Sequence, residues 1–140
     1  MNTAETLSID LFMNRLKELS EGLYFLSESD YPLEPIPVTP AAAGAITEPE
    51  IYQLAGKPAD SKLEIVDLPY FFRNMTADQP EADEEMQNIT HRFRELQAFL
   101  EGQLQDLKVY RVGQTEIAAL ILGKLSNTQF AGLKTMVVET

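Results

Sequence analysis

The chain has 140 residues, with 22 acidic side chains, 11 basic ones, one histidine and no cysteine; its formal net charge is −11 and its pI about 4.4. The length matches one domain, and we expect a single domain over residues 1–140. The negative charge disfavours direct binding to nucleic acid or to an anionic membrane and favours a basic partner. The missing cysteines exclude thiol catalysis and disulfides, and the lone His91 excludes a paired-histidine metal site.

The first segment predicts an amphipathic helix over residues 3–21, and Gly22 is placed to end it. Its charged side chains face away from an apolar face with steps of three and four, formed by Ile9, Phe12, Leu16, Leu19 and Leu23. This pattern differs from a signal peptide, and no stretch approaches the roughly 18 apolar residues of a membrane span. We therefore expect a cytoplasmic protein.

The next segments alternate between short apolar runs and polar or proline-rich stretches. Residues 23–26 predict a first buried strand, and residues 27–32 a polar turn. Spaced prolines make residues 33–45 an extended surface loop or an edge strand, because proline fixes φ and lacks a backbone donor. A capping box then predicts a short helix over residues 47–56.

A strand over residues 62–66 precedes a short helix over residues 68–75, capped by Asp67. A helix start signal at residues 78–81 then leads into the strongest helical pattern of the chain, with apolar residues at threes and fours from Met86 to Leu107.

The last third changes to a period of two and to β-branched residues, which predicts strands over residues 109–112, 117–122 and 130–139. These three strands form an antiparallel meander, and the earlier strands join the sheet through helical connections. We expect an α/β (α+β) fold, a three-layer α/β/α sandwich with a mixed sheet.

An acidic run at Asp78, Glu81, Asp83, Glu84 and Glu85 invites comparison with a metal site. It lacks the alternating spacing of a calcium loop, and acids at the start of a helix already complement the helix dipole. An acidic, metal-binding hydrolase based on these carboxylates stays open as an alternative, as does an acidic adaptor that binds some other basic protein.

Two other features carry carboxylates on short, ordered segments. Ser27 and Ser29 flank Glu28, with Asp30 next, and hydroxyl side chains can hydrogen-bond such a turn and hold the carboxylate outward. Residues 137–140 have the composition of a strand, so the α-carboxylate of Thr140 would lie on a rigid element beside Glu139. Fixed carboxylates can occupy the place of a phosphate oxygen.

Several blocks of the sequence together resemble the nuclease A inhibitor (NuiA) family. They are Leu-Tyr-Phe-Leu-Ser-Glu-Ser-Asp-Tyr-Pro at 23–32, Val-Asp at 66–67 with Phe-Phe at 71–72, Val-Tyr-Arg-Val-Gly at 109–113, and the segment from Ala-Gly at 131–132 to the Val-Val-Glu-Thr end at 137–140. The blocks occur in order and cover most of the chain.

The resemblance implies a protein inhibitor of a sugar-non-specific, metal-dependent endonuclease, and not an enzyme. It implies that Glu28 and Thr140 reach the metal of the nuclease, with Ser27, Ser29, Asp30 and Glu139 beside them at the partner-binding site. It implies no cofactor and no metal of the inhibitor's own, and we expect a monomer when free. The chain lacks the tryptophan that the known inhibitor carries before its long helix.

Overall fold

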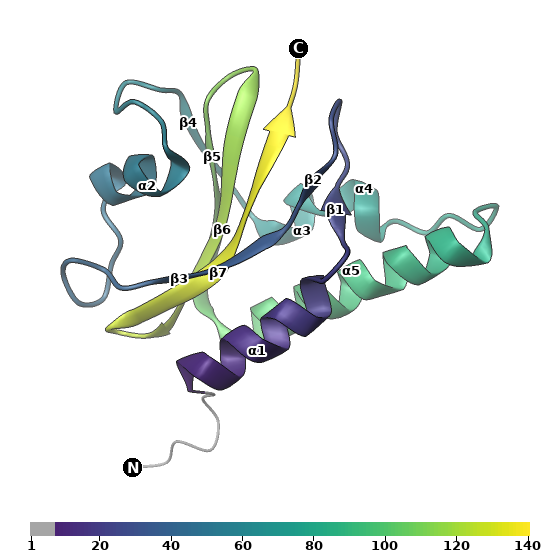
Figure 1. The fold of residues 1–140 in the computed structure, drawn as a ribbon, viewed down its shortest axis with the longest axis horizontal. Coiled ribbons are helices and arrows are strands. Elements are labelled where there is room, and N and C mark those ends of the chain that lie inside the picture. Colours follow the sequence, from purple (N-terminus) through teal and green to yellow (C-terminus); the bar gives the residue numbers. More distant parts are fainter. Residues whose placement is uncertain (1–7) are drawn as a thin grey trace.

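A computed structural model gives the structure of the chain and describes residues 8–140. The elements follow one another along the chain as α1 (Ile9–Ser20), β1 (Tyr24–Phe25), β2 (Tyr31–Pro32), β3 (Glu34–Val38), α2 (Glu48–Ala55), β4 (Leu63–Val66), α3 (Leu68–Phe71), α4 (Arg73–Thr76), α5 (Glu84–Gln103), β5 (Gln105–Val112), β6 (Glu116–Ser126) and β7 (Gln129–Val138) (Figure 1).

The main sheet has five strands in the order β3-β7-β6-β5-β4, and every neighbouring pair is antiparallel. The predicted α+β class and the C-terminal meander are confirmed, but the prediction of a mixed sheet is wrong. The earlier strands were expected to join the sheet through helical connections. They pair antiparallel with the meander at its two edges, β3 beside β7 and β4 beside β5.

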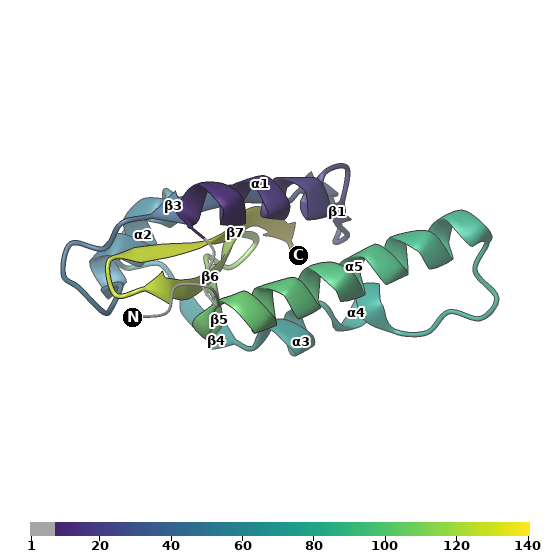
Figure 2. The same cartoon turned by 90° about the horizontal axis from the view of Figure 1, so that it is seen from below.

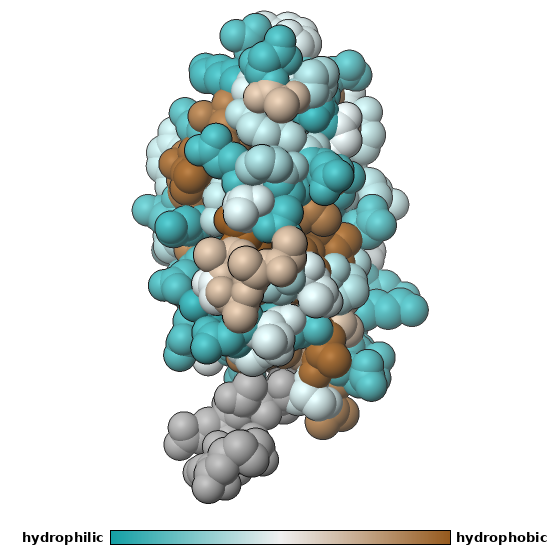
Figure 3. Space-filling model, turned by 90° about the vertical axis from the view of Figure 1, so that its left-hand side faces the viewer, coloured by the Kyte–Doolittle hydropathy of each residue, from teal (hydrophilic) through white to brown (hydrophobic). Residues whose placement is uncertain are grey.

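Helices cover both faces of this sheet (Figures 1 and 2). One face carries the larger core, to which α1, α3, α4 and α5 contribute, with Phe12, Phe72 and Phe93 fully buried. The other face packs against α2 through Ile51 and Ala55. Hydrophilic side chains cover much of the outer surface on the α2 side, with hydrophobic ones scattered between them (Figure 3).

The helix α1 corresponds to the predicted first helix, and Phe12 and Leu16 on its apolar face are fully buried. Ser8 is its N-cap, with an extended backbone, so the helix begins at Ile9; residues 3–7 of the prediction lie outside the described residues. Arg92 of α5 donates hydrogen bonds to the main-chain oxygens of Leu19 (3.2 Å) and Glu21 (2.7 Å).

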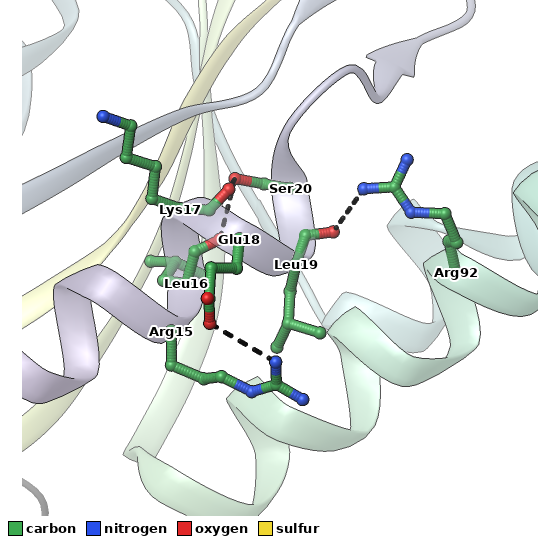
Figure 4. Close-up of polar contacts among 7 residues, drawn as sticks. All are labelled: Arg15, Leu16, Lys17, Glu18, Leu19, Ser20 and Arg92. Atoms are coloured by element: carbon green, nitrogen blue, oxygen red, sulfur yellow. Dashed lines mark hydrogen bonds and ion pairs between the residues drawn. The ribbon is translucent and has the colours of Figure 1, made fainter.

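These bonds satisfy carbonyls that a helix end leaves without partners, and Figure 4 shows Arg92 reaching across from α5. The Ser20 hydroxyl donates to the Leu16 carbonyl at 2.8 Å within the same turn. The end of α1 is therefore fixed to α5, and this sets the direction in which the chain enters β1.

The prediction of a buried strand at residues 23–26 is wrong in part. Only Tyr24 and Phe25 form β1, and they pair with Tyr31–Pro32, which lie in the predicted turn, as a separate two-stranded sheet. Alternate side chains face opposite sides of such a strand. Phe25 is accordingly buried, whereas Tyr24 and Leu26 are half exposed.

The long helix α5 begins at Glu84, after the N-cap Asp83, and not at residues 78–81. It ends at Gln103, although the apolar spacing continues through Leu104 and Leu107. Both leucines pack in the same core as the helix, although their backbone is extended. A register shift in β5 and the positive φ of Asp106 change the direction of the side chains at this point.

Other boundaries differ more modestly from the predictions. The helix predicted over 68–75 is two short helices, α3 and α4, separated at Phe72. The strand predicted to end at residue 122 continues to Ser126 as β6, which pairs with β7. The capping box of Thr47 and Glu50 is confirmed, and residues 34–38 form the edge strand β3. Within residues 8–140, no helix is both long and apolar enough to cross a membrane.

Candidate functional site

The turn that follows β1 is attached to the end of β7. The Ser27 hydroxyl donates to the Ser29 carbonyl at 2.7 Å, which closes the turn, and accepts the Val138 N–H at 3.1 Å. The Glu28 N–H in turn donates to the Val138 carbonyl at 3.3 Å. Ser27 therefore supports the turn and joins it to the last strand, as expected for a hydroxyl side chain in this position.

The carboxylate of Glu28 accepts two hydrogen bonds from Thr140. The Thr140 N–H donates to Oε2 and the Thr140 hydroxyl to Oε1, both at 2.6 Å. The two residues that the sequence singled out separately, 112 positions apart, are thus in direct contact. Hydrogen bonds from the Thr140 hydroxyl, then from its N–H, hold the pKa of the exposed Glu28 carboxyl below its ordinary value.

Glu139 is held by different partners. Its N–H donates to the Thr115 carbonyl at 2.9 Å, and its carboxylate lies 2.9 Å from Nη2 of Arg111. Arg111 on β5 is largely buried and also lies 3.4 Å from the Glu64 carboxylate of β4. These contacts fix the two residues that follow β7 in place.

Arg111 also belongs to the site, although no role was predicted for it from the sequence. The feature that could have indicated a role is its charge within the apolar strand pattern Val109-Tyr110-Arg111-Val112. A largely buried arginine is uncommon unless it is paired, and here it has two carboxylate partners. Its Nε atom is buried without a hydrogen-bond partner.

The remaining predicted residues of the site make fewer contacts. Ser29 contributes its main-chain carbonyl to the turn. Asp30 is exposed and forms no ion pair with residues 8–140. Both lie next to Glu28 on the surface.

The arrangement presents a fixed, exposed negative charge. A carboxylate has about four acceptor positions, and Thr140 uses two of those on Glu28. The carboxylate can therefore accept further hydrogen bonds, from the water shell of a cation or from a basic side chain, without releasing Thr140. Binding loses little conformational entropy at this side chain, because its hydrogen bonds already fix its orientation in the free protein.

The acidic run at 78–85 is arranged differently. Asp78 pairs with Arg94 at 2.6 Å, and Asp83 caps α5 by accepting the Met86 N–H at 2.8 Å. His91 is exposed, 3.6 Å from the Glu95 carboxylate. Across residues 8–140, no three His, Cys, Asp or Glu side chains come together as a metal would require.

The structure is thus an α+β scaffold in which the turn after β1 holds the exposed Glu28 carboxylate against the residues that follow the last strand. The chain belongs to the nuclease A inhibitor-like (NuiA) family, whose model matches residues 10–140. A comparison with curated proteins found no match. The proteins of this family are inhibitors, and the family indicates a nuclease inhibitor.

Proposed function

We propose that the protein inhibits a sugar-non-specific, metal-dependent endonuclease by occluding its active site in a 1:1 complex. Glu28 and Thr140 are the residues that carry the inhibition, with Ser27, Ser29, Asp30 and Glu139 around them. The contact between Glu28 and Thr140 supports this proposal most. The resemblance singled out these two residues, and they lie side by side on the surface.

The mechanism follows from the chemistry of the partner. A nuclease that grips a polyanion without sequence preference has a basic cleft, and a protein with a net charge of −11 is steered toward it. Steering of this kind raises association rates by roughly 10- to 1000-fold at low salt. The Glu28 carboxylate and the α-carboxylate of Thr140 then take the place of substrate phosphate oxygens near the metal.

The metal in this account belongs to the nuclease, and the inhibitor supplies only carboxylates and their orientation. No covalent step occurs on the inhibitor. Its contribution to affinity is the hydrogen-bonded geometry of the turn and of residues 138–140, which is already formed in the free chain.

The test is a titration of purified protein into a metal-dependent, sugar-non-specific endonuclease, with DNA cleavage as the readout. We expect cleavage to be suppressed at a 1:1 ratio. Both Glu28→Gln and removal of Thr140 should weaken that suppression. If the two variants inhibit as strongly as the unaltered chain, the proposed site is wrong.

A further inference from the structure

A groove lies directly beside Glu28, between the turn after β1, the helices α3 and α4, and the end of β7. Its walls combine apolar side chains with charges of both signs. Its lining includes Leu26, Glu28, Tyr70, Phe71, Arg73 and Glu139. It opens next to the predicted inhibitory carboxylate, so a partner bound at Glu28 would lie over it.

The groove has two exposed apolar side chains at its rim. Leu26 is 48% exposed and Tyr70 50% exposed. They are the chain neighbours of Phe25 and Phe71, whose buried rings stack with centroids 4.3 Å apart and planes 10° from parallel. The stack therefore fixes the positions of the two exposed side chains relative to each other.

Two of the exposed apolar side chains of the molecule line this groove. Six large hydrophobic side chains are exposed within residues 8–140, and four of them lie on the β1–β2 hairpin, the turn after β1 and α3: Tyr24, Leu26, Tyr31 and Tyr70. Leu26 and Tyr70 line the groove, whereas Tyr31 lines a separate one beside β7. Exposed apolar side chains that lie together are typical of interaction sites. Tyrosine in particular supplies contact area with little loss of side-chain freedom.

Arg73 adds a positive charge to the same rim. Its guanidinium lies 3.8 Å from the centroid of the Tyr70 ring, and Nη1 donates to the Tyr70 carbonyl at 2.7 Å. It forms no ion pair with any carboxylate of residues 8–140, and the guanidinium has five N–H donors. Tyr70 and Arg73 thus form a preformed pair, called the platform here, in which further N–H groups of the Arg73 guanidinium can donate to a partner.

We propose that Leu26, Tyr70 and Arg73 form a second contact point for the same nuclease, next to the Glu28 contact. This rests on the proposed function. The groove is lined by two carboxylates, Glu28 and Glu139, and by the Arg73 guanidinium. The complementary surface is a loop at the rim of the nuclease cleft that carries an apolar side chain beside a carboxylate, placed next to the basic, metal-containing centre.

In this arrangement the apolar side chain of the nuclease packs against Leu26 and Tyr70, and its carboxylate accepts from Arg73. Aromatic and arginine side chains at the centre of an interface carry a large share of binding energy, mainly by slowing dissociation. Glu28 then competes for the metal centre, while the platform determines which nuclease is held.

The experiment measures inhibition and dissociation with a nuclease that the unaltered chain inhibits. Tyr70→Ala should weaken inhibition about 10- to 100-fold, mostly through faster dissociation, and Arg73→Ala about 5- to 30-fold. Tyr70→Phe should stay within about twofold, because the ring and not the hydroxyl makes the contact. The matched control is Leu11→Ala, which removes a side chain that is 60% exposed on α1, and it should change nothing.

The outcomes separate this inference from the proposed function. If Glu28→Gln weakens inhibition and Tyr70→Ala does not, the second contact point is wrong and the proposed function stands. If the unaltered chain inhibits no such nuclease, both fail. If sedimentation shows that Tyr70→Ala abolishes self-association of the free chain, the groove binds a second copy and the inference is overturned.

Discussion

Two acidic regions of the molecule differ in what surrounds their carboxylates. At the end of β7, Glu28 accepts two hydrogen bonds from Thr140, and Glu139 pairs with a largely buried arginine. Along the run at 78–85, Asp78 and Asp83 stabilise the local chain, and the other three acids are exposed. Glu28 and Glu139 are thus held by residues that are distant in the chain, whereas Glu81, Glu84 and Glu85 are exposed on the surface.

The difference has a structural cause. The Glu28 region rests on the main core, because Phe25 and Phe71 stack beneath it and Arg111 anchors Glu139 to β5. The acidic run lies in the connection between α4 and α5 and in the first turn of α5, where acidic side chains complement the helix dipole. Substitutions in one region can therefore be tested without disturbing the other.

The largest effect is expected from Phe71→Ala, which removes a buried ring under the Glu28 turn. Loss of the ring and the resulting cavity should lower the free energy of unfolding by about 3–5 kcal/mol. Urea denaturation measures this. The adjacent Tyr70→Ala removes a half-exposed ring and should cost no more than about 1 kcal/mol. Equal losses in the two variants would contradict the packing described here.

A smaller effect is expected from Arg111→Met, which keeps an unbranched apolar stem in the strand and removes the guanidinium with its charge. The partners Glu64 and Glu139 are about half exposed and regain water, so unfolding should become easier by only about 1–2 kcal/mol. Hydrogen exchange at the Glu139 and Thr140 amides should accelerate more than at the β6 amides. Unchanged exchange at these two amides would show that Arg111 does not anchor this end.

The pKa of Glu28 offers a more local test. Because Thr140 holds it below its ordinary value of 4.5, the contact stabilises the folded end above about pH 4.5 and is lost as the pH falls through the lowered pKa. Thr140→Val removes the hydroxyl donor, so the pKa should rise toward 4.5 in an NMR titration. Glu50, whose pKa is lowered by Thr47 and Ala41, is the internal control and should not move.

The smallest effect is expected in the acidic run. Glu81→Gln combined with Glu85→Gln removes two exposed charges and should slow association with a nuclease only by a few-fold at low salt. Dissociation should be unchanged, which surface plasmon resonance can measure. A large rise in the dissociation rate would place this run in the interface itself.

The sequence predicted the α+β class, both strong helices, the meander and the capping box, because each depends on local spacing. It did not predict that β3 and β4 lie on opposite edges, since strand order depends on how the whole sheet closes over its core. It extended α5 too far, because Leu104 and Leu107 serve the same core from a strand.

For the site, the sequence singled out Glu28 and Thr140 one by one, each from its own segment. Their direct contact depends on β1 and β7 lying side by side, and no short-range pattern encodes that. The role of Arg111 could not be predicted for the same reason, because its partner Glu139 is 28 residues away along the chain.

The most direct measurement compares the inhibition constants of Glu28→Gln and Glu81→Gln against one metal-dependent, sugar-non-specific endonuclease. Both variants remove one exposed negative charge, so overall steering is matched at a net charge of −10, that is −11 + 1. We expect the inhibition constant of Glu28→Gln to be at least about 30 times that of the unaltered chain, and that of Glu81→Gln to stay within about threefold of it. Equal inhibition constants for the two variants would contradict the proposed role of Glu28.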